Sequence, residues 1–211
     1  RVKIYDLNET SDEGLSIKEL VKKKIFWIFM LMMVCSGASE QAVSQWASTF
    51  AEEGLGVTKA VGDLAGPMSF AVMMGLSRFI FGKYGEKLNL DRFMKFSCVL
   101  CVASYLMISL SSSAVLGLIG CALTGFAVGI MWPGTYSKSA VAIKGGGTAM
   151  FALLALGGDL GCSSGPTLAG FVSSIAGGNL RAGILSAVIF PALLLVGLFL
   201  CGTEVKKSGK D

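Results

Sequence analysis

The run Ile25–Phe50, IFWIFMLMMVCSGASEQAVSQWASTF, decides the fold class of this chain. Its first half is almost wholly apolar, and no lysine or arginine interrupts the run. A helix needs about 20 largely apolar residues to cross the hydrocarbon core of a bilayer. The run therefore predicts a membrane-spanning helix. Its second half carries Glu40 among several amide and hydroxyl side chains, which must face protein or water rather than lipid.

Five further apolar segments follow, so we predict an all-α integral membrane protein with six spans. The expected spans are Ile25–Phe50, Val61–Phe81, Phe93–Leu110, Ala114–Tyr136, Thr148–Ile175 and Leu180–Cys201. Only helices and closed barrels satisfy their backbone in lipid, and barrel strands alternate polar with apolar residues. These segments do not alternate, which favours helices. We expect a cytoplasmic linker over residues 1–24, a bundle over 25–203 and a cytoplasmic tail over 204–211.

The composition supports a membrane protein. Hydrophobic residues make up 53% of the 211 residues and charged residues 15%, against about 25% charged in soluble domains. The mean hydropathy is +0.68. No signal peptide precedes the spans, and because the chain opens at Arg1 we expect it to be a piece of a longer protein. Ser16 and Glu19 have the spacing of a capping box, which predicts a short helix on the membrane surface.

The basic residues predict how the chain is oriented. With six crossings, only Lys59 and Arg181 fall on one side, while Arg78 lies inside the second segment. The other 15 of the 18 fall on the opposite side: Arg1, Lys3, Lys18, Lys22, Lys23, Lys24, Lys83, Lys87, Arg92, Lys95, Lys138, Lys144, Lys206, Lys207 and Lys210. Such an excess marks the cytoplasmic side, so both ends should be cytoplasmic. The net charge of +4 then reflects topology and gives no reason to expect a nucleic acid partner.

The cysteines do not indicate a cofactor, a metal or a disulfide framework. All six lie inside apolar runs, and the chain has no histidine to complete a metal site. Cys98 and Cys101 form a C-x-x-C pair, but a redox motif needs accessible thiols. We interpret the cysteines as small buried hydrophobic residues.

A polar stripe marks the first span as a candidate binding site. Positions four apart share a helix face, so Glu40 lies above Ser44 and Gln41 above Gln45, with Trp46 following. A charge at the bilayer centre costs about 2.5–3.5 kcal/mol and needs a partner or a wet cavity. We favour a solute or proton site that lines a cavity. A structural hydrogen bond to a neighbouring helix is the alternative.

Asp159 and Arg78 are the other charges inside expected spans. Asp159 lies mid-span among glycines that permit close helix approach, and Pro166 can bend that helix. The carboxylate is either a second solute site or a bond to neighbouring backbone. Arg78 lies near the cytoplasmic end of its span, where we expect it to reach the interface or form a gating salt bridge.

The fourth span carries a helix-packing pattern. Gly125 and Gly129 form a small-x-x-x-small pair, which is typical of close helix contacts. Trp132, Pro133 and Gly134 follow near the cytoplasmic boundary. Trp132 is either an interfacial anchor or a cavity wall.

The loop Gly82–Lys87, GKYGEK, resembles the cytoplasmic loop motif of the major facilitator superfamily, Asp-Arg-x-Gly followed by basic residues. Lys83 matches its basic position and Gly85 its glycine. Gly82 stands where the family has its aspartate, Glu86 departs from the basic pattern, and Lys87 ends the motif. The stretch Gly37–Trp46 and the residues around Asp159 resemble bacterial fucose-permease-like and related sugar-type members.

The resemblance implies twelve helices in two halves, each built from 3+3 inverted repeats. This chain would be the C-terminal half, residues 1–24 the end of the linker, and the N-terminal half its partner. It also implies a bacterial inner-membrane transporter that works by alternating access and moves a small polar solute such as a sugar, coupled to protons. Glu40 would bind the proton or the solute.

Three other functions stay open at this point. Efflux of apolar drugs is compatible with the ten methionines. A non-transporting scaffold would use the six helices as an oligomer core. An intramembrane enzyme would need Glu40 and Asp159 within hydrogen-bond reach of each other.

Overall fold

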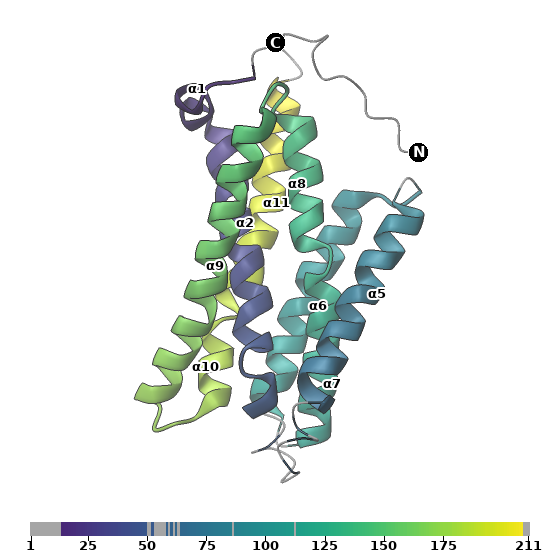
Figure 1. The fold of residues 1–211 in the computed structure, drawn as a ribbon, viewed down its shortest axis with the longest axis vertical. Helices are drawn as coiled ribbons and strands as arrows, with labels where there is room; N and C mark the ends of the chain where they lie inside the picture. The colour runs from purple at the N-terminus through teal and green to yellow at the C-terminus, as the bar shows by residue number, and fades with distance from the viewer. Residues whose placement is uncertain are drawn as a thin grey trace.

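The computed structural model describes residues 14–49, 64–85, 87–111 and 113–208, together with the single residues 52, 58, 60 and 62. Helices and short connections make up these residues, with no strand among them. The helices lie side by side along the longest axis of the molecule, and α1 and the last turns of α11 lie at the same end of the bundle (Figure 1). The expectations for residues 1–13 and 209–211, Phe50, Lys59, Val61 and Glu86 fall outside the described residues.

The helices follow the expected spans with shifted boundaries. They are α1 (Ile17–Lys22), α2 (Lys24–Ser44), the π-helical turn η2 (Leu64–Met68), α5 (Ser69–Tyr84), α6 (Leu90–Leu110), α7 (Ala114–Val128), α8 (Met131–Ala142), α9 (Gly147–Ile175), α10 (Leu180–Ser186) and α11 (Ile189–Ser208).

Five helical stretches in the described part of the chain are long and apolar enough to cross a membrane. They are Lys24–Thr49, Leu64–Tyr84, Leu90–Leu110, Val115–Ala142 and Leu180–Thr203. The fifth expected span, Thr148–Ile175, forms α9, whose 29 residues exceed the length that a crossing needs. Its central aspartate, serines and glycines make it less apolar than the other five.

The predicted capping box at Ser16 is confirmed. Glu19 Oε2 accepts a 2.8 Å bond from the Ser16 backbone N–H, while Ser16 Oγ accepts from the Glu19 N–H. These backbone and side-chain hydrogen bonds to the carboxylate lower the pKa of Glu19. Helix α1 ends at the extended residue Lys23, where α2 begins. The Trp27 indole on α2 donates to the Val21 carbonyl at 2.8 Å and ties the two helices together.

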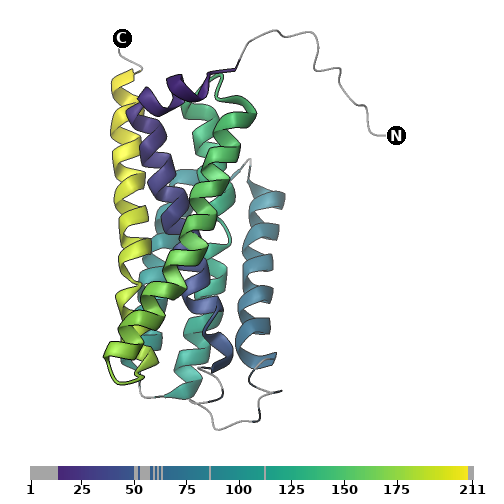
Figure 2. The same ribbon diagram turned by 60° about the vertical axis from the view of Figure 1, so that its left-hand side comes forward.

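Helices α2 and α9 meet backbone to backbone along a row of glycines, here called the glycine seam: Gly37, Gly161 and Gly165. A Cβ on Gly37 would lie against the Gly158 carbonyl oxygen, and one on Gly161 against that of Val34. One on Gly165 would lie 2.5 Å from the carbonyl oxygen of Ala38, closer than real Cβ atoms approach. Only glycine therefore permits this crossing, which Figure 2 shows from the side.

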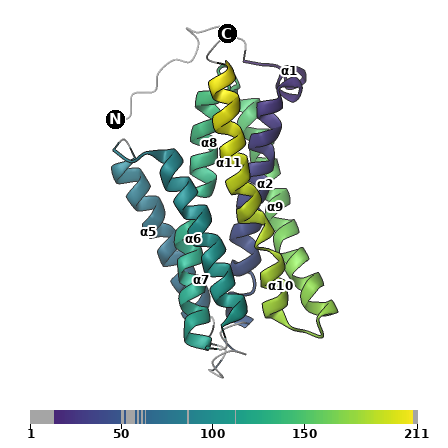
Figure 3. The same cartoon turned by 180° about the vertical axis from the view of Figure 1, so that it is seen from behind.

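A second close approach joins α7 to α5. A Cβ on Gly125 would lie against the Phe70 carbonyl oxygen, and one on Gly129 would lie 2.8 Å from the Met74 oxygen. The two glycines that the sequence singled out for helix packing thus lie where α7 crosses α5. Helices α5, α6 and α7 form one side of the bundle, and α2, α9, α10 and α11 the other (Figures 1 and 3).

Prolines break two of the expected spans. The fourth span was expected as one helix over Ala114–Tyr136, but it divides into α7 and α8 around Gly129 and continues to Ala142. Pro133 has no N–H to donate to the Gly129 carbonyl, so the helix ladder is interrupted there. Pro191 likewise removes a bond to Ala187, where α10 ends and α11 follows. Helix α9, in contrast, runs unbroken through Pro166.

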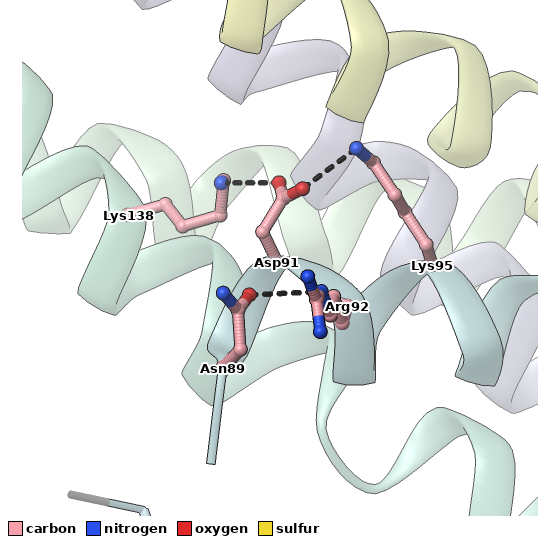
Figure 4. A network of polar contacts seen from close by, with 5 residues as sticks. All are labelled: Asn89, Asp91, Arg92, Lys95 and Lys138. Carbon is pink, nitrogen blue, oxygen red and sulfur yellow. Dashed lines mark hydrogen bonds and ion pairs between the residues drawn. The ribbon is translucent and has the colours of Figure 1, made fainter. Parts of the chain in front are cut away.

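A polar network joins the first turns of α6 to α8 near one end of the bundle (Figure 4). Asp91 Oδ1 lies 2.9 Å from Lys138 Nζ, and Asp91 Oδ2 lies 2.6 Å from Lys95 Nζ. Lys95 Nζ also lies 4.5 Å from the centre of the Phe199 ring on α11. Asn89 caps α6 by accepting from the Arg92 N–H at 3.0 Å. The network therefore connects three helices near their ends.

We predict that Gly161→Ala destabilises the protein, because the added Cβ has no space against the Val34 backbone. Overpacking of this kind costs about 1–3 kcal/mol. The matched control is Gly75→Ala on α5, where nothing lies within 4 Å of an added Cβ. Alanine there should be neutral or stabilise the helix by up to about 1 kcal/mol. Thermal unfolding in detergent micelles measures both, and equal effects would contradict the seam.

We also predict that Tyr105→Phe lowers the free energy of unfolding by about 1 kcal/mol. The Tyr105 hydroxyl is buried on α6 and donates a 2.7 Å bond to the Ser39 carbonyl on α2. Tyr84→Phe, at an exposed position at the end of α5, serves as the control and should change little. The same unfolding measurement tests this bond, and a Tyr105→Phe protein as stable as the parent would refute it.

Candidate functional site

A cleft opens between α2, α5 and α8. Glu40 reaches it from α2 and Arg78 from α5, while Trp132, Pro133 and Tyr136 line it from the first turns of α8. Its volume is about 470 Å³, and it is open on one side. All three elements belong to stretches that are apolar enough to cross a membrane. The cleft therefore places two charged side chains among membrane-spanning segments.

Glu40 and Arg78 form an ion pair across the cleft. Arg78 Nη2 lies 3.7 Å from Glu40 Oε2. The Glu40 side chain is 15% exposed, whereas that of Arg78 is 46% exposed. The carboxylate is therefore largely covered by protein, whereas nearly half of the Arg78 side chain is exposed. Each charge lowers the cost of the other in an apolar environment.

The helix break described above also holds Arg78. Because Pro133 cannot donate to the Gly129 carbonyl, that oxygen is free, and Arg78 Nε donates to it at 3.4 Å. Arg78 thus connects Glu40 on α2 with the junction of α7 and α8. The sequence predicted an interfacial or gating role for Arg78, and the structure places its side chain in the cleft.

Aromatic rings extend from the cleft toward α9. The ring centres of Trp132 and Tyr136 are 6.3 Å apart, and those of Tyr136 and Phe151 are 5.7 Å apart. The far edge of the Trp132 ring packs over Gly158, where a Cβ would clash with it. Sequence reasoning missed Tyr136 as a site residue. Its position one helical turn after Trp132 could have placed it on the same face.

The remaining polar residues of the first span lie outside the residues that line this cleft. Helix α2 ends at Ser44, and Gln45 and Trp46 form a turn. Trp46 packs toward α9, where a Cβ on Gly170 would lie 3.1 Å from its ring. Gln41 and Ser44 are half-buried and Gln45 is exposed. Of the predicted stripe, the structure therefore brings Glu40 to the cleft.

Asp159 lies on an exposed part of α9. An electrostatic interaction links it with Tyr136, so it lies near the aromatic end of the cleft. Within the described residues, no hydrogen bond joins the carboxylates of Glu40 and Asp159. The contact that an acid pair would need for intramembrane catalysis is therefore not present between these two side chains.

The predicted loop motif lies at the end of α5. Gly82, Lys83 and Lys87 are exposed and Gly85 is half-buried. Lys83 Nζ lies 5.7 Å from the ring centre of Phe79 and 5.4 Å from that of Tyr84, so its charge lies near two aromatic rings. No ion pair of Lys83 or Lys87 occurs among the described residues. The motif therefore lies apart from the cleft.

The chemistry of the other side chains does not point to a metal. All six cysteines are free, five are buried, and Cys162 on α9 is partly exposed. The described residues contain no group of three or more cysteine, aspartate or glutamate side chains that could hold a metal ion. The cleft between α2, α5 and α8 is thus the candidate site.

Comparison with known proteins identifies the family. The family model of the Major Facilitator Superfamily matches residues 6–150, which is more than half of the chain. A search among curated proteins finds no match. The family match agrees with the helices and with stretches apolar enough to cross a membrane. The chain therefore belongs to the Major Facilitator Superfamily, a family of multi-pass membrane transporters and not of enzymes.

Proposed function

We propose that this chain is the C-terminal six-helix half of a secondary active transporter that moves a small polar solute by alternating access. The observation that carries the proposal is the Glu40–Arg78 pair in an open cleft between three membrane-spanning stretches. A charged pair among membrane-spanning segments costs free energy, so its presence favours a role in binding or coupling. A sugar-like solute is the first candidate, by resemblance to fucose-permease-like members.

The proposed half has six spans in 3+3 inverted repeats, with α9 as the fifth span beside the five more apolar stretches. The N-terminal half is its proposed partner and would close the open side of the cleft. The basic ends of the helices support an orientation with both ends of the chain cytoplasmic. We place the protein in the inner membrane of a bacterium.

Proton coupling is proposed to act through Glu40. Protonation would remove its negative charge and release Arg78 from the ion pair. Arg78 also binds the Gly129 carbonyl at the junction of α7 and α8, so a change at Glu40 reaches the backbone of a broken helix. Broken helices at membrane depth are the elements that transporters use for solute and ion sites.

Drug efflux is the second candidate. The observation that favours it is the aromatic wall of Trp132 and Tyr136, because aromatic and methionine side chains adapt to varied apolar ligands. The charged pair at the cleft favours the polar solute instead. A scaffold without transport would have no use for either charge.

We predict that Glu40→Gln abolishes the pH dependence of uptake, because the amide cannot exchange a proton. The measurement is uptake by the protein containing this chain, reconstituted into liposomes with an imposed proton gradient. Glu19→Gln is the matched control, since it makes the same change in an exposed carboxylate on α1, outside the cleft, and should leave the pH dependence unchanged. Unchanged uptake and pH dependence in Glu40→Gln would exclude the role of Glu40.

The solute class is tested by a panel of sugars and small polar metabolites in the same liposomes. Uptake that an uncoupler collapses would support a proton-driven importer. Export of apolar dyes without uptake of any panel member would favour efflux.

A further inference from the structure

The residues that line the cleft offer more hydrogen-bond donors than acceptors. A guanidinium carries five N–H donors and no acceptor. Among the described residues, Arg78 makes an ion pair with Glu40 Oε2 and a hydrogen bond to the Gly129 carbonyl. The indole N–H of Trp132, another residue that lines the cleft, is buried and has no hydrogen-bond partner in the described part of the chain. Glu40 brings the one carboxylate among the residues that line the cleft. A ligand that completes this set must bring acceptor oxygens.

The charges favour a negative ligand over a neutral one. When Glu40 binds a proton, Arg78 keeps its positive charge but loses its counter-ion. Among the described residues, Arg78 is then left with the Gly129 carbonyl as a partner, and this oxygen carries only a partial charge. An unpaired guanidinium among membrane-spanning helices is costly. A carboxylate matches the planar fork of the guanidinium with two parallel hydrogen bonds, which a sugar hydroxyl does not.

We propose that the transported solute is a small organic carboxylate, which Arg78 binds in place of Glu40 when Glu40 is protonated. The proposal rests on the proposed transport function and names its solute class. Trp132 and Tyr136 would pack against the carbon skeleton, and the open cleft of about 470 Å³ accommodates a metabolite of several carbons. The solute and Glu40 thus compete for one guanidinium.

This competition for Arg78 sets how many protons cross with each solute molecule. One proton enters on Glu40 for each carboxylate on Arg78, so a monoanion and a proton cross together and no net charge moves. The charged and titratable groups near Glu40 are Arg78 on α5, Tyr136 on α8 and Cys162 on α9, and Asp159 lies next to Tyr136 and Cys162. Of these, Arg78 is the one that carries a positive charge and directly contacts Glu40.

The test compares solutes that differ in the carboxylate alone. Proteoliposomes holding the protein that contains this chain are given glucuronate against glucose, and lactate against lactamide, with the outside acidic. We expect uptake of at least one carboxylate at roughly tenfold or more the rate of its neutral partner, as a charge-assisted bond implies. The rate should respond to the pH gradient but not to a membrane potential set with potassium and valinomycin.

Substitutions assign the carboxylate to Arg78. Arg78→Gln should remove the preference within the pair, and Arg78→Lys should keep part of it because the charge remains. Arg92→Gln, which removes an exposed cation at the start of α6, is the control and should leave the preference intact. A preference that survives in Arg78→Gln would overturn the proposal.

The outcomes separate this inference from transport itself. Uptake of glucose or lactamide with no preference for the carboxylate overturns the solute class and leaves the transporter standing. Carboxylate uptake that follows the membrane potential overturns the exchange with Glu40. No uptake of any panel member overturns both the solute class and the proposed proton-driven import.

Discussion

Backbone contact between α2 and α9 is the constraint on which the rest of the structure depends. In lipid, apolar side chains gain little by leaving their surroundings for one another, so helices associate through close van der Waals contact. The glycine seam provides that contact, because each of its glycines faces a carbonyl of the partner helix. The crossing fixes α2 against α9 and thereby fixes where Glu40 lies. Trp132 completes the arrangement by packing over Gly158.

The other side of the cleft depends on a backbone hydrogen bond that α8 cannot form. Pro133 lies in the part of α8 that lines the cleft, and its lack of an N–H frees the Gly129 carbonyl for Arg78. Gly129 itself is where α7 approaches α5, so Arg78 on α5 needs only a short reach. A proline, a glycine and an arginine from two distant segments thus hold the guanidinium opposite Glu40. These three residues thus hold a charged side chain within otherwise apolar helices.

The charges at the end of the bundle have a different task from those in the cleft. Asp91 joins Lys95 and Lys138 where the side chains remain 18–37% exposed, so water screens the pairs and each adds little stability. Their value lies in geometry, because they connect α6 with α8 at the helix ends. The Glu40–Arg78 pair lies among membrane-spanning segments, where charges cost more free energy, and its energy changes with the charge on Glu40. The two sets of ion pairs therefore suit anchoring and switching, respectively.

Local patterns in the sequence determined the class of this protein. Long apolar segments specify helices because lipid leaves the backbone no other partners, and the capping box at Ser16 acts over three residues. The packing role of Gly125 and Gly129 also followed from spacing alone. Each of these features depends on residues that are neighbours in sequence. Physical chemistry of a single helix is then enough to predict them.

Tertiary structure alone decided the site. Glu40, Arg78 and Tyr136 are far apart in sequence, and only the crossing of α2, α5 and α8 brings them to one cleft. The same crossings leave Gln45 and Trp46 outside it, although they belong to the stripe that the sequence favoured. A helical repeat shows which residues share a face, but it does not show which neighbour that face will meet. That choice depends on where glycines let two backbones touch, and it therefore appears only when all the helices are packed together.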